Sequence, residues 1–158
     1  MNVQIRIANR EDLDWINSKY YELQFSPSVY ENEFIAIAEW ENETIGVGRL
    51  ICLGNNSFEL GGIYVADQFR EQGVAKKIAF FLLQRVKEFH TVYCLPFSHL
   101  MDFYQKLGFE LCREDEEVPE EIRIRHKSCQ DTYQHRVLLM KLVPNPAEIQ
   151  KKELSILI

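Results

Sequence analysis

The chain has 158 residues, of which 46% are hydrophobic and 12% aromatic, enough apolar side chains for the core of one globular domain. Its 18 lysines and arginines against 24 aspartates and glutamates leave a formal net charge of −6. That charge disfavours nucleic-acid binding, which requires many phosphates to be neutralised. The sequence has no apolar run of membrane-spanning length and no signal-peptide pattern, so we expect a cytoplasmic protein that does not bind a membrane. The four cysteines are widely spaced, which predicts reduced, packed thiols and no metal site.

The first part of the chain predicts a strand, a helix and three further strands. Alternating apolar residues indicate a strand over residues 3–7, and Asn9 can cap a helix that runs to about Leu23. Further strands, separated by turn residues, are expected over 33–40, 44–53 and 58–65. An antiparallel meander is the simplest arrangement of these three strands.

The second part alternates helices with strands. An apolar stripe at helical spacing predicts a long helix from Val74 to Phe89. The later elements are a strand over 91–95, a brief helix over 100–107 that Gly108 ends, a strand from Phe109, a helix from about residue 118 and a last strand over 135–143. This order predicts an α/β fold with a mixed sheet and helices on both faces, formed by one domain over 1–143 and followed by a tail over 144–158.

The most informative segment is the loop that leads into the long helix. It contains Arg70, Gly73 and Ala75 in the pattern R-x-x-G-x-A. Free N–H groups and the helix dipole attract an anion to a helix N-terminus, small residues let it approach the backbone, and Arg70, Lys76 and Lys77 add positive charge. A diphosphate fits such a place. By itself, the segment is equally compatible with an ordinary turn before a helix.

A second pattern, Tyr104-x-Lys106-x-Gly108-Phe109, follows the next strand. With the two patterns in this order and at this separation, the chain resembles the GNAT superfamily of N-acetyltransferases, whose pyrophosphate motif is written Q/R-x-x-G-x-G/A. The resemblance covers roughly residues 1–143 and is strongest around the two patterns.

This resemblance implies a mostly antiparallel mixed sheet and acetyl-CoA as the acyl donor. It implies that acetyl-CoA is contacted by Ile63, Tyr64, Val65, Arg70, Glu71, Gln72, Gly73, Val74, Ala75 and Lys76. Many relatives carry an asparagine near the end of the fifth strand that contacts the cofactor arm, whereas this chain has Leu95-Pro96-Phe97-Ser98-His99 there. The family further implies direct transfer of the acetyl group to an amine in a ternary complex.

The resemblance also implies the catalytic groups. The phenol of Tyr104 would give a proton or a hydrogen bond to the leaving thiolate, and a backbone N–H near Val65 would stabilise the oxyanion. A core tyrosine is the competing interpretation of Tyr104. Glu59 matches the position of a general-base glutamate in some relatives, although a solvated carboxylate at a strand end has the same sequence pattern. His99 is the rival base, and Cys94 is expected to be a packed thiol.

The acceptor is expected to be a primary amine of a small molecule or a peptide. The family plan puts the acceptor pocket near four aromatic residues, Trp15, Tyr20, Tyr21 and Phe25, and part of this group is expected in the core. Three acidic residues could attract a cationic amine there: Glu22, Glu31 and Glu33. The alternative function is a non-catalytic acyl-CoA-binding regulatory or protein-interaction domain on the same fold. The apolar tail end, 154–158, could dock on a second copy of the chain in a homodimer or on its own core.

Overall fold

A computed structural model describes residues 1–142 of the chain. The predicted tail over 144–158 lies outside the described residues. The strands are β1 (Gln4–Ile7), β2 (Glu33–Trp40), β3 (Glu43–Gly54), β4 (Ser57–Val65), β5 (Thr91–Cys94), β6 (Glu110–Leu111) and β7 (Met140–Leu142). The α-helices are α1 (Leu13–Glu22), α2 (Val74–Leu83), α3 (Met101–Leu107) and α4 (Glu120–Thr132), and 3-10 turns are η1 (Arg10–Asp12), η2 (Asp67–Phe69) and η3 (Ser98–Leu100). None of the helices within residues 1–142 is both long and apolar enough to cross a membrane.

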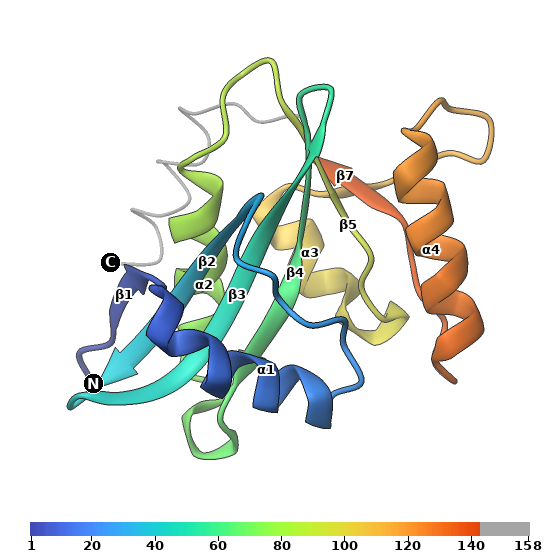
Figure 1. The fold of residues 1–158 in the computed structure, drawn as a ribbon. Helices are drawn as coiled ribbons and strands as arrows, with labels where there is room; N and C mark the ends of the chain where they lie inside the picture. Colours follow the sequence, from blue (N-terminus) through green and yellow to red (C-terminus); the bar gives the residue numbers. More distant parts are fainter. Residues whose placement is uncertain (143–158) are drawn as a thin grey trace. The chain divides into compact units, whose positions relative to one another are not determined.

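The strands within residues 1–142 form one seven-stranded sheet in the order β1-β2-β3-β4-β5-β7-β6 (Figure 1). β1 and β2, β2 and β3, β5 and β7, and β6 and β7 pair antiparallel, whereas β4 and β5 pair parallel. The predicted α/β class with a mixed, mostly antiparallel sheet is therefore confirmed. The described residues divide into two compact units, the first made of Met1–Cys52 with Gly61–Arg85 and the second of Leu53–Leu60 with residues 86–142.

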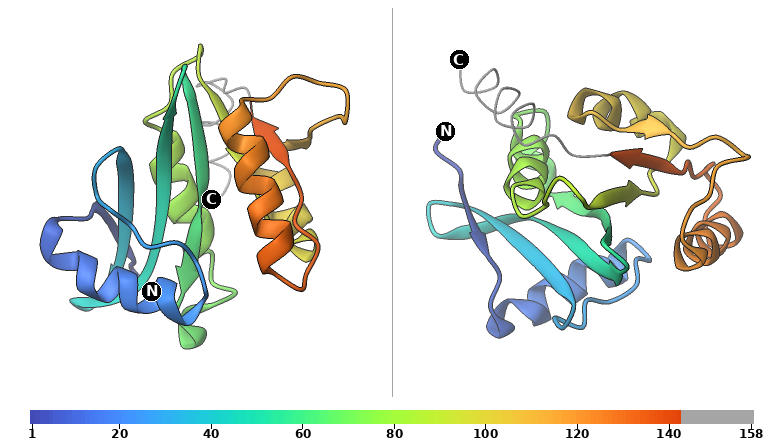
Figure 2. Two further views of the ribbon diagram at one scale, coloured as in Figure 1. Left: turned by 45° about the vertical axis from the view of Figure 1, so that its right-hand side comes forward. Right: turned by 90° about the horizontal axis from the view of Figure 1, so that it is seen from above.

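In the first unit, α1 and α2 cover opposite faces of the strands (Figure 2). Both helices pack against β3, because its side chains alternate between the two faces of the sheet. Val47 joins the buried cluster that contains Ile16 and Tyr20 of α1. On the other face, a Cβ at Gly48 would lie 2.5 Å from Cγ2 of Ile78 in α2. β3 thus presents the side chain of Val47 to α1. To α2 it presents Gly48, which has no side chain, and this lets α2 pack close to the sheet.

In the second unit, α3 and α4 lie on opposite faces of the β5 and β7 pair (Figure 2). β5 pairs with the first part of β4 through a register that matches Glu59 with Tyr93 and Leu60 with Cys94. The helix predicted from about residue 118 is α4, which buries Ile122 completely. This unit therefore contains the predicted general base Glu59 and the predicted proton donor Tyr104.

α2 is shorter than its apolar stripe predicts. It ends at Leu83 instead of Phe89, and Phe89 is 67% exposed. The reason is a local turn in which the His90 N–H donates to the Lys87 carbonyl at 3.0 Å and the Lys87 N–H donates to His90 Nδ1 at 2.8 Å. These bonds give the backbone an alternative to the helical pattern.

The last strand also begins later than predicted, at Met140 instead of residue 135, and the predicted end at residue 143 lies outside the described residues. Ahead of it, the Leu138 N–H donates to the Pro96 carbonyl at 2.8 Å, and an isolated bridge joins Phe97 to Val137. Proline has no N–H to return such a bond, so the ladder is interrupted beside Pro96.

Gly62 of β4 provides a test of packing in the first unit. Its φ is +59°, and an added Cβ would lie 2.5 Å from the Tyr20 hydroxyl oxygen. Gly62→Ala should lower the free energy of unfolding by about 2–4 kcal/mol, because a left-handed backbone and overpacking both add cost. Gly54→Ala is the matched control, since Gly54 has φ +80° with nothing within 4 Å of an added Cβ. Equal losses in chemical denaturation would contradict the packing described around Tyr20.

Candidate functional site

The first unit contains the start of α2, where the sequence predicts a diphosphate site. Gly73 is the N-cap of α2 with φ +82°, and no side chain caps this helix. The first-turn N–H groups therefore lie at the positive end of the helix dipole without a side-chain acceptor. A Cβ on Gly73 would meet nothing within 4 Å. Within the protein itself, the requirement for glycine here is conformational, because the left-handed region disfavours other residues.

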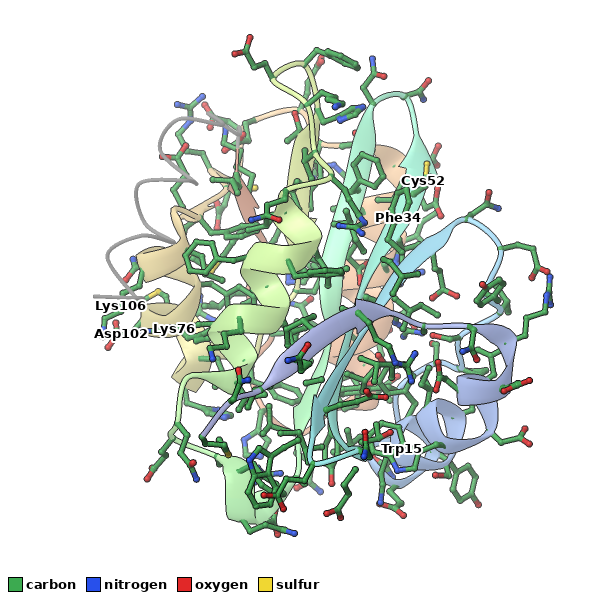
Figure 3. All side chains as sticks on the ribbon, turned by 90° about the vertical axis from the view of Figure 1, so that its left-hand side faces the viewer. Trp15, Phe34, Cys52, Lys76, Asp102 and Lys106 are labelled. Atoms are coloured by element: carbon green, nitrogen blue, oxygen red, sulfur yellow. The ribbon has the colours of Figure 1, made fainter. Side chains whose placement is uncertain are left out.

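The cations of this loop have different surroundings. Arg70 Nε donates to the Val65 carbonyl at 2.9 Å, and its Nη2 lies 3.0 Å from Asp67 Oδ1. Arg70 thus ties the loop to the end of β4 while its side chain stays 55% exposed. The first turn of α2 carries Lys76, labelled in Figure 3, and no acidic residue. The charge of this turn therefore favours an anion.

The other predicted cofactor contacts lie on either side of this loop. Ile63 and Tyr64 are half-buried in β4, Val65 is buried at its end, and Val74 is buried in α2. Glu71 and Gln72 are exposed, and Glu71 has a left-handed φ of +62°. The predicted residues thus follow one continuous path from β4 through the loop into α2.

The predicted aromatic group of α1 divides into three environments. Tyr20 is fully buried, and its hydroxyl donates to the Gly62 carbonyl at 2.8 Å, so it belongs to the core. Tyr21 is 86% exposed. Trp15 packs against Tyr64 with ring centroids 6.2 Å apart, and Lys19 Nζ lies 5.9 Å from each of the two ring centroids. Phe25, which follows α1, packs against Tyr20 with ring centroids 5.9 Å apart, so Tyr21 alone among the four stands apart from this packing.

Arg49 is a buried charge that the sequence reasoning missed. Its side chain donates to Ser28 Oγ at 3.0 Å, to Glu33 Oε1 at 3.3 Å and to the Ser26 carbonyl at 2.9 Å. Its guanidinium carbon lies 4.5 Å from the centroid of the Tyr20 ring. The sequence does contain a signal for it: Arg49 lies two residues after the buried Val47, so both side chains belong to the same face of β3. Arg49 and Glu33 together fix the loop between α1 and β2.

The three glutamates expected to attract a cationic acceptor each have a cationic partner. Glu33 pairs with Arg49, Glu31 with Arg10 at 2.7 Å, and Glu22 with Lys19 at 3.8 Å. Paired carboxylates create little net field. The expectation that this group attracts an ammonium therefore loses its physical basis.

Tyr104 of α3 is the predicted donor to the leaving group. Its side chain is 7% exposed and packs edge-on against Phe103 and Phe109, with ring centroids 5.0 and 5.8 Å apart. Within residues 1–142, its hydroxyl forms no hydrogen bond with another residue. Burial, with smaller contributions from Cys94 and Glu59, raises the pKa of Tyr104 above its usual range. The phenol is therefore a stable donor with an unused hydrogen.

Glu59 is neither solvated nor at a strand end. It lies within β4 at 9% exposure, where Arg125 of α4 binds both carboxylate oxygens. Arg125 Nε donates to Oε1, and Nη2 donates to Oε2 at 3.3 Å. Sequence reasoning did not identify Arg125, because 66 residues separate the partners and nothing in the sequence pairs them. A base at Glu59 would therefore act in competition with the Arg125 cation, which binds both of its oxygens.

The remaining candidates are the thiol of Cys94 and the imidazole of His99. Burial, followed by the charges of Glu59 and Cys112, raises the pKa of Cys94 well above its ordinary value. Cys94 is thus the packed thiol that the sequence predicts and a poor nucleophile. His99 is exposed on η3, where its ring stacks on Phe97 with centroids 5.9 Å apart. His135 adds an edge contact to His99 at 5.8 Å.

Comparison with known proteins agrees with this geometry. A family model described as the acetyltransferase (GNAT) domain matches residues 13–126. No curated protein matches the chain in a sequence search. The chain belongs to the GNAT acetyltransferase family.

Solved structures show the same fold at low sequence identity. Rv2747 from Mycobacterium tuberculosis, in complex with CoA and NLQ, has a TM-score of 0.70 and 19% identity, covering 90% of this chain and 99% of that chain. N-acetylglutamate synthase from Neisseria gonorrhoeae, complexed with coenzyme A and N-acetyl-glutamate, has a TM-score of 0.69 and 18% identity, covering 90% of this chain and 35% of that chain. A GNAT family acetyltransferase from Elizabethkingia anophelis with acetyl-CoA bound has a TM-score of 0.62 and 18% identity, covering 89% of this chain and 97% of that chain.

The cysteines test the electrostatics of the second unit. All four are free thiols, but Cys52 is exposed (Figure 3), which corrects the expectation that all four are packed. Burial, followed by Glu116, raises the pKa of Cys112 to about 11, and burial also raises the pKa of Cys129. A thiol reagent at pH 8 should therefore label Cys52 first and reach Cys94 only after unfolding. Cys52→Ser should remove the first phase, whereas loss of that phase in Cys94→Ser would contradict this order.

Proposed function

We propose that this protein is an N-acetyltransferase that moves the acetyl group of acetyl-CoA onto a primary amine by direct attack in a ternary complex. The observation that carries the proposal is the start of α2, which has no side-chain cap, follows a left-handed Gly73 and contains the R-x-x-G-x-A pattern. The neighbours solved with CoA or acetyl-CoA support the choice of donor. The N-acetyl-glutamate bound to one of them, an acetylated amine, supports the choice of acceptor class. The cytoplasmic location and the homodimer stay predictions.

The diphosphate of the donor is assigned to the first turn of α2. Backbone N–H groups of Val74, Ala75 and Lys76 would donate to its oxygens, because a helix N-terminus combines free donors with a positive dipole end. Lys76 and Arg70 would add charge, although Arg70 already binds the Val65 carbonyl and Asp67. Ile63, Tyr64 and Val65 of β4 are assigned to the pantetheine arm, and Glu71 and Gln72 to the loop that surrounds the diphosphate.

The reaction requires an electron pair and two protons to move. The lone pair of the neutral amine attacks the thioester carbonyl carbon, and the carbonyl oxygen becomes an oxyanion that a backbone N–H near Val65 would stabilise. When this intermediate collapses, the C–S bond breaks and the sulfur leaves as the CoA thiolate. The nitrogen loses its proton to form the amide, and the thiolate finally takes up a proton to give CoA.

Tyr104 is assigned to the leaving thiolate as a hydrogen-bond donor. A thiol has a pKa of about 8.5, whereas burial raises the pKa of the Tyr104 phenol above its usual range. Complete proton transfer from the phenol to the thiolate would therefore run uphill. A hydrogen bond to the developing negative charge lowers the barrier without that transfer, and solvent can supply the proton afterwards.

Glu59 is assigned as the group that deprotonates the acceptor. An alkylammonium has a pKa of about 10.4 and must lose a proton before it attacks. Glu59 is buried and within electrostatic reach of Tyr104, since its charge contributes to the raised pKa of that phenol after the effect of burial. His99 is exposed and stacked on Phe97, and remains the rival base.

Gly73→Glu tests the donor site. Acetyl-CoA at a hundredfold excess over its dissociation constant should stabilise the wild-type fold by about 2.7 kcal/mol. Gly73→Glu should abolish this shift, because bulk and negative charge then occupy the diphosphate position. Gly54→Glu is the matched control: Gly54 also has a left-handed φ and open surroundings, but is the last residue of β3, far along the chain from α2. An unchanged thermal shift in Gly73→Glu would exclude the α2 N-terminus as the site.

Tyr104→Phe tests catalysis. The wild-type protein should release CoA thiol from acetyl-CoA in the presence of one or more members of a panel of primary amines. Tyr104→Phe should lower that rate by about 10²-fold and leave acetyl-CoA affinity nearly intact, because it removes a charge-assisted hydrogen bond formed only as the thiolate leaves. A wild-type rate in Tyr104→Phe would remove Tyr104 from the mechanism. Binding of acetyl-CoA without thiol release for any amine would favour the non-catalytic alternative.

A further inference from the structure

The inward side of α4 is unusual because charge lies in its middle. Ile122, Arg125, His126 and Cys129 recur at helical spacing and are the buried or half-buried positions of this helix. A surface helix normally buries an apolar stripe and exposes its charges. Here Arg125 faces inward, whereas Ile124, one position earlier, is 61% exposed. A position that breaks this rule is a candidate for function, because packing alone does not call for it.

Arg125 binds Glu59 in a two-point ion pair that is partly exposed to solvent. The Arg125 side chain is 32% exposed, while the Glu59 side chain is 12% exposed. No other residue among those described forms an ion pair with Glu59. A solute can therefore approach the guanidinium directly, and the carboxylate becomes accessible when the guanidinium moves away.

The contacts of α4 are suited to such a movement. Ile122 is its fully buried side chain, and His126 Nε2 lies 2.8 Å from the Val137 carbonyl near its middle. The Arg125 side chain is long and has several rotatable bonds, so it can leave Glu59 while both of these contacts remain. The ion pair can therefore open without unfolding the helix.

The charges of this pair limit which acceptor can open it. If Arg125 leaves Glu59, the buried carboxylate requires another cation, and the half-buried guanidinium requires another anion. An amine without a carboxylate supplies only the first of these partners. An acceptor that carries both an ammonium and a carboxylate supplies both, so the number of ion pairs is unchanged.

We propose that Arg125 and Glu59 recognise an acceptor that carries a primary amine and a carboxylate, as a free amino acid does. The acceptor carboxylate replaces Glu59 on Arg125, and the acceptor ammonium replaces Arg125 on Glu59. This inference rests on the proposed function, and it adds the substrate class and the specificity residue Arg125. An N–H bond of the ammonium then breaks, the proton bonds to a Glu59 oxygen and later passes to solvent, and the amine keeps the electron pair that attacks the thioester.

The exchange also explains how Glu59 can act as a base despite its partner. In the free protein both of its oxygens are bound by Arg125. Binding of the acceptor carboxylate removes this competitor and brings the ammonium to Glu59 in the same step. Proton transfer is thereby tied to the arrival of the correct acceptor.

The test compares each of a set of α-amino acids with its own carboxamide, which keeps the amine and the side chain but has no negative charge. Thiol release from acetyl-CoA gives kcat/KM for each. The wild-type protein should prefer the carboxylate of at least one pair by about tenfold to a hundredfold, the usual effect of a charge-assisted hydrogen bond. Arg125→Met should abolish the preference, and Arg125→Lys should restore part of it. The ratio of preferences between variants cancels the different intrinsic reactivities of amino acid and amide.

Lys127→Met is the matched control, because it removes a cation of the same helix whose partner is the exposed Asp131. It should keep the wild-type preference. The proposal is overturned if the wild-type protein acetylates carboxamides or simple alkylamines as well as amino acids. It is equally overturned if Arg125→Met lowers both members of each pair by the same factor, as a purely structural ion pair would. If Arg125→Met does not fold, the ratio of preferences between the wild-type protein and Arg125→Lys takes its place, and an unchanged preference in Arg125→Lys would overturn the proposal.

A binding measurement separates this inference from the proposed function. In the presence of CoA, a preferred amino acid should raise the melting temperature of the wild-type protein, and its carboxamide should not. Amino-acid binding without turnover would leave the recognition site standing and defeat the acetyltransferase assignment. Turnover of amines without preference for a carboxylate would support the acetyltransferase assignment and overturn the recognition site. If the protein neither binds nor acetylates any of these compounds, both proposals are overturned.

Discussion

A charge removed from water must be paired, and this constraint governs both units of the protein. In the first unit, the buried Arg49 is paired with Glu33, and the two together hold the loop between α1 and β2. In the second unit, the buried Glu59 is paired with Arg125 of α4. Removing one member of such a pair costs about 3–5 kcal/mol, because the other charge is left without a partner. The chain therefore keeps these charges only where both members are supplied, either by the protein or by a ligand.

The same low-polarity surroundings determine which groups can react. Burial raises the pKa values of Tyr104 and Cys94, so the phenol keeps its proton and the thiol remains a weak nucleophile. This favours direct attack by the amine over an acetyl-cysteine intermediate. It also favours a hydrogen bond from Tyr104 over complete proton transfer. One physical effect thus selects among the mechanisms that the residue types alone would allow.

Local chemistry in the sequence was enough to predict most of the fold. The strand β2 was predicted with its observed bounds, and the predicted cap Asn9 caps η1, the 3-10 turn that leads into α1. Periodicity and capping act over a few neighbouring residues and can therefore be predicted locally. The pattern around Gly73 likewise predicted the start of α2 at Val74. The predicted end of α2 and the predicted start of β7 were wrong, since they depend on a turn at Lys87 and on Pro96, which lies far from β7 in the chain.

The ion-pair partners could not be predicted in this way. Arg125 lies 66 residues from Glu59, and Arg49 lies 16 residues from Glu33, so only the tertiary fold brings them together. From the sequence alone, the cationic partners of Glu22, Glu31 and Glu33 were not visible. This led to the expectation that these glutamates attract a cationic amine. Once their partners are known, recognition of the acceptor by charge is assigned to one ion pair, Glu59 and Arg125. The acceptor must then be able to replace both members of this pair.

The central claim is that the acetyl group passes directly from CoA to an amine. Acetyl-CoA with an isotope label in its acetyl group, incubated with the protein and a mixture of amino acids, tests this claim most directly when mass spectrometry follows the label. The account predicts that the label appears as the amide of an amino acid, in an amount equal to the CoA thiol released, with none attached to the protein. Label retained on a cysteine of the protein, or label found only as free acetate, would contradict it.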